Sequence, residues 1–155
     1  MRAVIQRVKK ASCVVDGKIT GQIGIGALIL LGVKVGDTEK NAEYLVEKIA
    51  NVRIFQEGDK EFDKSLLDIK GEVLVISQFT LYADAASGRR PDFIDAAKGN
   101  EAEPLYRKFI DLLKAKGLKV EEGIFGAMMD IELLNSGPVT IIIDSRENRT
   151  ESCFP

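Results

Sequence analysis

Val75-Ile76-Ser77-Gln78-Phe79-Thr80-Leu81 is an apolar, strand-like run that polar residues interrupt near its end. A second stretch, Asn135-Ser136-Gly137-Pro138-Val139-Thr140, places a Gly-Pro dipeptide at the start of a β-branched run that continues to Ile143. Apolar and β-branched runs of this length are typical of buried strands. Hydroxyl and amide groups at the end of a buried strand need hydrogen-bond partners, and a ligand can be one of them. The two stretches therefore predict two core strands that carry the polar and conformationally special groups of the chain at their ends.

Strand patterns recur along the rest of the sequence. Asp16-Gly17 is a strong hairpin turn between two of them, and residues 27–33 have the composition of a fully buried strand. The acidic segment 59–63 is predicted to be a mobile loop. Strands are predicted over residues 2–8, 11–15, 18–23, 27–33, 52–55, 72–79, 119–124, 128–134 and 139–144.

Two amphipathic helices complete the pattern. Asp37 or Thr38 caps the first helix, which runs to about residue 50. Asn100 caps the second, with Glu103 in a box-like signature, and Gly117 ends it. We therefore expect an α/β domain with an antiparallel or mixed sheet, curled like a barrel, and two main helices packed on it. The buried face of the second helix is predicted to contain Leu105, Phe109, Leu112 and Leu113.

Composition limits the classes of function. The 155 residues are 45% hydrophobic, enough for a single domain over residues 1–155 with a real core. The net charge of −2 does not indicate a strongly basic surface that would bind duplex nucleic acid. A short single-stranded end needs only a few local contacts, so binding to such an end is still open. Cys13 lies in a strand-like apolar context and is expected to be a buried thiol, whereas Cys153 lies near the end of the sequence. Two cysteines and no recognisable signal peptide favour a reducing cytoplasm, and no segment predicts a membrane span.

The chain contains no histidine. This excludes Ser-His-Asp and Cys-His catalysis and removes the commonest general base near neutral pH and the commonest zinc ligand. The sequence shows no cluster of metal ligands, and its glycines are not followed by a helix as a phosphate-binding fingerprint requires. Any chemistry must therefore use carboxylates, lysines, hydroxyls, backbone amides or the substrate itself, and we expect no metal and no cofactor.

Four segments have both a structural and a functional interpretation. Ser77 to Thr80 fits a ligand site at a strand end, but a strand leaving the core with its hydroxyls paired to nearby backbone is slightly favoured by the residues alone. Gly137-Pro138 is more often an ordinary trans turn, since only about 5–6% of X-Pro bonds are cis in folded proteins. The basic segment 87–91 fits a phosphate contact or a solvated loop. The segment 125–129 fits a nucleobase pocket or methionine core packing.

Taken together, the segments resemble one known family, the D-aminoacyl-tRNA deacylases, also called D-tyrosyl-tRNA deacylases. The match spans nearly the whole chain in order, and the Ser-Gln-Phe-Thr and Gly-Pro-Val-Thr segments together are its most specific part. The family usually has aspartate at position 136, where this chain has serine, and the segment 60–65 also differs from the family pattern. The resemblance is carried by Arg7-Val8, Ala11-Ser12, Arg53-Ile54-Phe55, Ser77 to Leu81, Gly88 to Phe93, Gly126 to Met129 and Asn135 to Thr140.

The resemblance implies a cytoplasmic, homodimeric esterase that acts on the aminoacylated 3′ end of tRNA. It would release D-amino acids, and glycine mischarged on alanine tRNA, while sparing L-aminoacyl substrates. The implied catalytic segment is Ser77, Gln78, Phe79 and Thr80. Backbone N–H groups around Phe79 and Thr80 would polarise the ester carbonyl while water attacks, and the 2′-OH of the terminal adenosine is a candidate assistant. Thr80 as a nucleophile is the second hypothesis, because no base adjoins it in sequence.

The resemblance also implies how chirality is read. A cis Gly137-Pro138 pair would insert into the partner subunit's site, where its carbonyl oxygens would reject an L side chain and ignore glycine. Phe125 and Met129 are the candidates for contacting the adenine. The alternative functions are a non-catalytic module that binds a nucleic-acid end and a homo-oligomer that binds a small molecule.

Overall fold

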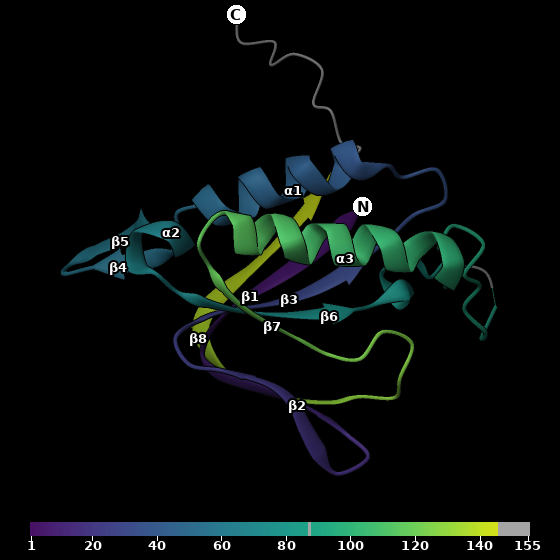
Figure 1. The fold of residues 1–155 in the computed structure, drawn as a ribbon, viewed down its shortest axis with the longest axis horizontal. Coiled ribbons are helices and arrows are strands. Elements are labelled where there is room, and N and C mark those ends of the chain that lie inside the picture. The colour runs from purple at the N-terminus through teal and green to yellow at the C-terminus, as the bar shows by residue number, and fades with distance from the viewer. Residues whose placement is uncertain (87, 146–155) are drawn as a thin grey trace, which may run out of the picture.

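The computed structural model describes residues 1–86 and 88–145, which form one α/β domain built on a six-stranded mixed sheet (Figure 1). Its strands run in the order β2-β1-β3-β6-β7, and β8 pairs with the other edge of β1. β1 is antiparallel to β2, β3 and β8, whereas β3, β6 and β7 are parallel to one another. The strands are β1 (Arg2–Val15), β2 (Lys18–Ile23), β3 (Gly26–Gly32), β6 (Glu72–Ser77), β7 (Lys119–Glu122) and β8 (Asp130–Asp144).

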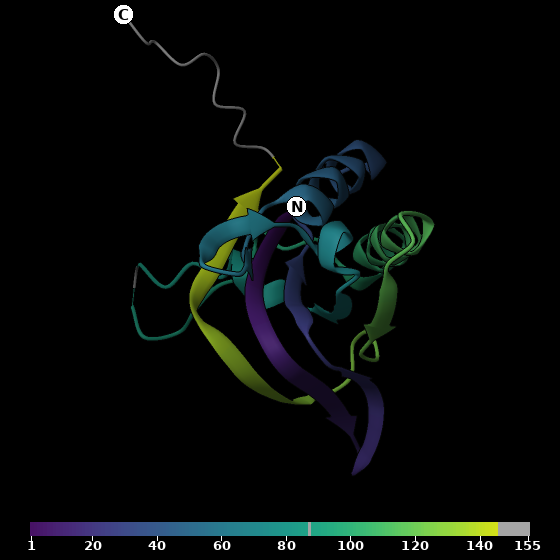
Figure 2. The same cartoon turned by 90° about the vertical axis from the view of Figure 1, so that its left-hand side faces the viewer.

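The sheet curls because the long strand β1 pairs with two different strands along the same edge. Its first half, Arg2 to Val8, pairs with β3, and its second half, from Ala11, pairs with β2 (Figure 2). β2 bends over β6 and β7, and a Cβ atom added at Gly21 would lie 2.9 Å from the carbonyl oxygen of Glu122. A small apolar core fills the space inside this bend. The nearly closed mixed sheet confirms the predicted fold class.

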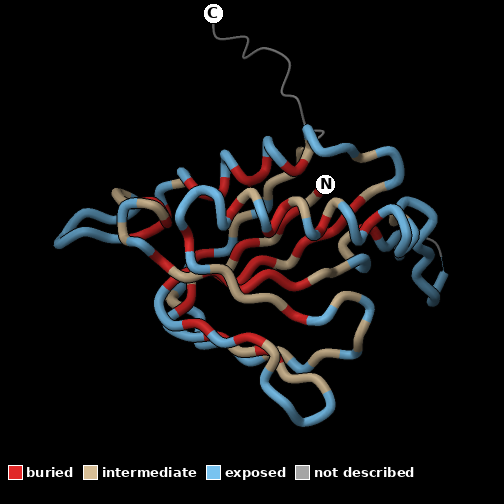
Figure 3. Tube along the Cα trace, in the orientation of Figure 1, coloured by how far each residue is buried: buried red, intermediate tan, exposed pale blue. Residues whose placement is uncertain are grey.

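Two long helices, α1 (Glu39–Asn51) and α3 (Gly99–Ala115), cover the other face of the sheet side by side. Their apolar faces enclose the larger core, and the buried segments concentrate between these helices and the strands (Figure 3). Thr38 is the N-cap of α1, as predicted, and Asn41 completes the capping box. The remaining elements are β4 (Phe55–Glu57), β5 (Lys60–Lys64), the short helix α2 (Leu66–Ile69) and the 3₁₀ turn η1 (Phe79–Tyr82).

Several predicted boundaries were wrong. β1 and β8 are each continuous where two strands were expected, because each follows its neighbour across a local bulge. The acidic segment expected to be a loop forms β5, which pairs with β4 as a hairpin, and the strand expected at 52–55 begins only at Phe55. β6 ends at Ser77, and η1 replaces the last predicted strand residues. Cys13 is buried, as expected, whereas Cys153 lies outside the described residues.

Helix α3 begins at Gly99 with Lys98 as its N-cap, so the predicted cap at Asn100 was wrong. The N–H of Ala97 donates to the carbonyl of Val33 at 3.0 Å, and this long-range bond fixes where the chain enters the helix. The buried face is correspondingly shifted, and two of the predicted residues, Leu105 and Leu112, are only half-buried. The buried residues are Ala102, Tyr106, Phe109, Ile110 and Leu113, spaced as one helical face requires.

Gly26 allows the close approach of β3 to β6. A Cβ atom at this position would lie 1.8 Å from the carbonyl oxygen of Glu72, so the two backbones would have to separate. We expect Gly26→Ala to lower the free energy of unfolding by roughly 1–3 kcal/mol, as overpacking of a core does. Gly24→Ala is the matched control, because its Cβ would meet only the Glu72 carboxylate at 3.8 Å. Equal stability of both variants in urea titrations would contradict this account of the β3–β6 contact.

Candidate active site

A cavity of about 610 Å³ opens where β3 and β6 end. Ligand sites in sheets with parallel strands commonly lie beyond the carboxyl ends of those strands. The first turns of α3 and the segment after β7 form the other walls. The lining residues are Leu31, Val33, Ile76, Ser77, Gln78, Phe79, Thr80, Ala97, Gly99, Ala102, Tyr106, Phe125, Gly126, Ala127, Met128, Met129 and Ile131. The structure thus brings Ser77 to Thr80 together with Phe125 and Met129, which the sequence separates by about 45 residues.

The backbone turns sharply where residues 77–80 line this cavity. The N–H of Gln78 donates to the carbonyl of Leu31 at 2.8 Å, which is the last bond between this segment and β3. The chain then forms the 3₁₀ turn η1, whose first residues are Phe79 and Thr80. The first N–H groups of a helical turn have no acceptor within the turn. The N–H groups of Phe79 and Thr80 are therefore available as donors beside the cavity. The predicted polarisation of an ester carbonyl requires such donors.

The side chains of this turn are held by their neighbours. The Gln78 side-chain amide donates to the Thr80 hydroxyl, which is exposed. The Phe79 ring is 57% exposed and meets the Phe93 ring edge-on, with 5.0 Å between the ring centroids. Gln78 therefore orients Thr80, and Phe93 supports the outer side of the turn.

Every residue that lines the cavity is uncharged. Tyr106 is the one titratable residue among them, and its hydroxyl donates to the carbonyl of Val75 at 2.9 Å. Burial, with a smaller contribution from Glu122, raises the pKa of Tyr106 far above its usual range. The tyrosine therefore stays protonated at neutral pH and acts as a structural donor rather than as a base.

The segment after β7 forms another wall of the cavity. Phe125 packs on Tyr106, with 5.5 Å between the ring centroids, and Met129 is half-buried. Met128 lines the cavity mouth and is 93% exposed. Tyr106 was not predicted to line a site, because the periodicity of α3 indicates only core packing. Met128 lies within the segment 125–129 that was predicted as a possible nucleobase pocket, although only Phe125 and Met129 were named as adenine contacts.

Gly137 and Pro138 do not line this cavity in the same chain. They lie in β8, both are exposed, and the peptide bond between them is cis. The strand register explains why they protrude: Gln6 pairs with Thr140 and Val8 with Asn135, so four residues of β8 stand opposite the single residue 7. This bulge pushes the Gly-Pro segment out of the ladder.

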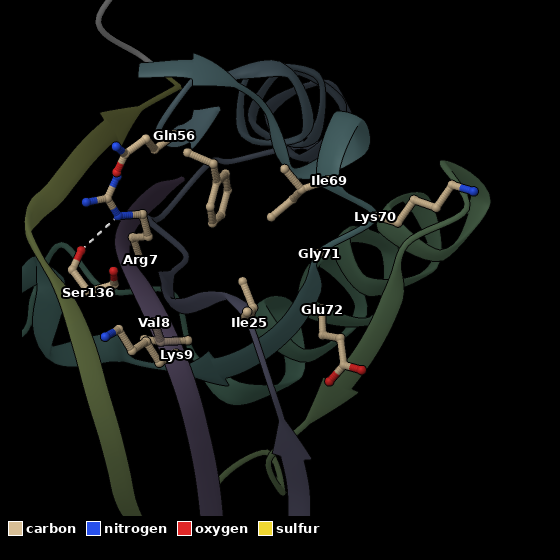
Figure 4. Close-up of a pocket in the computed structure, with 11 residues that line it drawn as sticks. Arg7, Val8, Lys9, Ile25, Gln56, Ile69, Lys70, Gly71, Glu72 and Ser136 are labelled. Atoms are coloured by element: carbon tan, nitrogen blue, oxygen red, sulfur yellow. Dashed lines mark hydrogen bonds between the residues drawn. The ribbon is translucent and has the colours of Figure 1, made fainter. Parts of the chain in front are cut away.

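Arg7 holds the base of the bulge. Its Nε donates to the carbonyl of Ser136 at 2.8 Å, and its Nη1 donates to the carbonyl of Ile54 at 2.6 Å. Figure 4 shows Arg7 at the wall of a second cavity of about 830 Å³, with the bond to Ser136 dashed. The sequence predicted no such role, because the contact joins residues 129 positions apart. Because the acceptor is the backbone carbonyl of residue 136, this contact does not depend on the serine side chain.

Within residues 1–86 and 88–145, no three His, Cys, Asp or Glu side chains gather in a way that could hold a metal ion. The helices of the same residues are all too short or too polar to cross a membrane.

Comparison with known proteins identifies the family. The family model described as D-Tyr-tRNA(Tyr) deacylase matches residues 4–144. A D-aminoacyl-tRNA deacylase of Aquifex aeolicus is 60% identical over 147 residues, covering 95% of this chain and 99% of the relative. One of Clostridium beijerinckii is 53% identical, covering 96% of this chain and 99% of the relative.

Two solved structures have the same fold. One, described as c-Myc DNA Unwinding Element Binding Protein, is 40% identical with a TM-score of 0.87, over 93% of this chain and 98% of that one. The other, described as a probable eukaryotic D-amino acid tRNA deacylase, is 17% identical with a TM-score of 0.82, over 92% of this chain and 98% of that one, and shows the fold alone. On the family model and the close relatives, this chain belongs to the D-Tyr-tRNA(Tyr) deacylase family.

Proposed function

We propose that this protein hydrolyses the ester bond of D-aminoacyl-tRNA and releases free tRNA and the D-amino acid. The observation that carries the proposal is the uncharged cavity at the end of β6, with the N–H groups of Phe79 and Thr80 beside it. The names of the close relatives support the same activity. A tRNA substrate is compatible with the cytoplasmic location that we propose for the protein.

The proposed reaction needs little from ionisable side chains. Water adds to the ester carbonyl carbon, and the N–H groups of Phe79 and Thr80 stabilise the negative charge that develops on the carbonyl oxygen. The tetrahedral intermediate then collapses, and the ribose oxygen leaves with a proton. The neighbouring 2′-OH of the terminal adenosine can relay that proton, since the lining of the cavity supplies neutral groups only.

The proposed chiral filter comes from a second copy of the chain. Gly137 and Pro138 protrude from β8, and this strand also exposes Leu133, Leu134 and Ile142. In the described residues β8 pairs with β1 alone, so its other edge is open to a partner. We propose a homodimer in which each Gly-Pro segment reaches the partner's cavity. Its carbonyl oxygens would meet an L side chain but leave a D side chain or glycine unhindered.

The RNA end would occupy the wall formed after β7. Phe125 and Met129 offer an aromatic ring and a polarizable thioether, which suit the face of an adenine. The Tyr106 ring packs against the Phe125 ring. Alanine at either position would then weaken binding of the acylated end more than it slows the chemical step.

The proposed function is tested by deacylation of matched D-tyrosyl-, L-tyrosyl- and glycyl-tRNA with the purified protein treated with a chelator. Release from the D and glycyl substrates, with the L substrate spared, is the expected result. Substrate that binds without turnover would contradict the esterase proposal.

Thr80→Ala separates the two mechanisms. The backbone mechanism keeps both N–H groups in this variant, so we expect kcat to fall less than about tenfold, the loss of one neutral hydrogen bond. A nucleophilic Thr80 would instead lose nearly all turnover. Single-turnover deacylation of D-tyrosyl-tRNA gives the rate, and Gln78→Ala, which frees the Thr80 hydroxyl, is the companion variant.

One observation favours a second candidate function. A structure 40% identical to this chain is described as a DNA unwinding element binding protein. A binding module would retain a 3′-adenosine ester analogue without cleaving the ester. The net charge of −2 argues against extended contact with duplex DNA.

A further inference from the structure

We propose that Met128 is an oxidation site whose sulfoxide weakens binding of the acylated RNA end, an inference that rests on the proposed function. The sequence contains three methionines, and the structure gives each a different environment. Met1 is fully buried, Met129 is half-buried and Met128 is 93% exposed. One thioether of the three is therefore open to a reagent in solution.

The local backbone explains this exposure. Gly126 has a φ of +77°, and the N–H of Ala127 donates to the carbonyl of Ile124 at 3.1 Å, which closes a turn just before Met128. Beyond the turn, the Met129 sulfur lies against Gly123, 2.5 Å from the position that a Cβ atom would take there. The two adjacent methionines thus differ in access, although both line the cavity.

The oxidant we propose is a peroxide, either hydrogen peroxide or an alkyl hydroperoxide. The thioether sulfur attacks one peroxide oxygen, the O–O bond breaks, and the second oxygen leaves as water or alcohol after taking a proton. The sulfur loses two electrons and the peroxide gains them. The product is methionine sulfoxide, which methionine sulfoxide reductases return to methionine.

Oxidation would change the mouth of the cavity. A flexible apolar side chain becomes polar, and its S=O group is well hydrated while the cavity is open. An adenosine lying between Phe125 and residues 79–80 would cover the S=O group and remove its hydrating water. This desolvation costs binding free energy, whereas covering an apolar thioether does not. We expect KM for D-tyrosyl-tRNA to rise on the order of tenfold. The expected change in kcat is small, since Phe79 and Thr80 lie on the other wall.

The test compares wild type, Met128→Leu and Met129→Leu before and after limited hydrogen peroxide. Each variant is referred to its own untreated KM and kcat, and peptide mass spectrometry follows the oxygen added at each methionine. Wild type and Met129→Leu are expected to gain oxygen at Met128 and to show the higher KM. Met128→Leu is expected to keep its own KM. Methionine sulfoxide reductase should restore the wild type, whereas dithiothreitol, which acts on oxidised cysteines, should not.

Three outcomes would overturn the proposal. An equal rise of KM in Met128→Leu would place the damage elsewhere, and Met128 oxidised no faster than Met129 would mean that a partner covers it. Unchanged KM after complete oxidation of Met128 would remove its proposed effect. If the untreated protein has no deacylase activity, the proposed function fails by itself. The affinity of a 3′-adenosine ester analogue before and after oxidation then decides the role of Met128.

Discussion

Gly137→Ala is expected to lower kcat/KM for D-tyrosyl-tRNA on the order of 100-fold, because its methyl group would displace the substrate from the reacting geometry. In its own chain the glycine is exposed, and an added Cβ would meet only the flexible Asn135 amide, at 3.0 Å. Its φ lies outside the left-handed region, so alanine fits the backbone. The variant should therefore fold and unfold like the wild type while it loses activity in the partner's cavity.

The control removes the local contact. Asn135→Ala alone should retain activity, and Asn135→Ala combined with Gly137→Ala should be as impaired as Gly137→Ala, because the proposed contact lies across the proposed dimer. Recovery of activity in the double variant would assign the defect to crowding within one chain. Full activity of Gly137→Ala would remove the Gly-Pro segment from the site altogether.

The predictable parts of this fold depend on local signals. Thr38 caps α1 through residues of the first helical turn, so the signal is contained in a few neighbouring residues. The hairpin turn at Asp16-Gly17 has φ values of 49° and 74°, which aspartate and glycine tolerate. The start of α3 was predicted two residues late because a bond from Ala97 to Val33 fixes it. Residues far apart in sequence set that boundary, and a local capping pattern does not contain them.

The same division applies to the site. The polar residues that follow Ile76 predicted the end of a buried strand with hydroxyl and amide groups in need of partners. In the structure these residues line a cavity. The wall opposite it comes from segments more than 20 residues further along, including Tyr106. The role of Arg7 depends on a register shift between β1 and β8, which no single-strand pattern specifies. The resemblance to a family supplied the Gly-Pro assignment, which the residues alone left open.

Phe79→Pro is expected to reduce the single-turnover rate by about 10²–10³-fold beyond the effect of Phe79→Ala, the usual cost of losing one oxyanion donor. Proline at this position removes the backbone N–H, whereas alanine keeps it, and both variants lose the ring contact with Phe93. Phe79 is the first residue of η1, where proline is well tolerated, and Gln78 before it has φ −142° and ψ 81°, outside the helical region. Equal rates in the two variants would exclude the Phe79 N–H as a donor.

Mixing the Phe79→Pro and Gly137→Ala variants tests two proposals together: the role of the Phe79 N–H, and a site that contains the partner's Gly-Pro segment. A dimer of Phe79→Pro with Gly137→Ala has one intact cavity, and that cavity receives the intact Gly-Pro segment of its partner. After dissociation and random reassociation of equal amounts, half of the dimers are mixed, so about a quarter of the wild-type sites should work. Each variant alone should keep its own reduced activity under the same treatment. If the Gly-Pro segment served its own chain instead, every cavity in the mixture would remain defective and no activity would return.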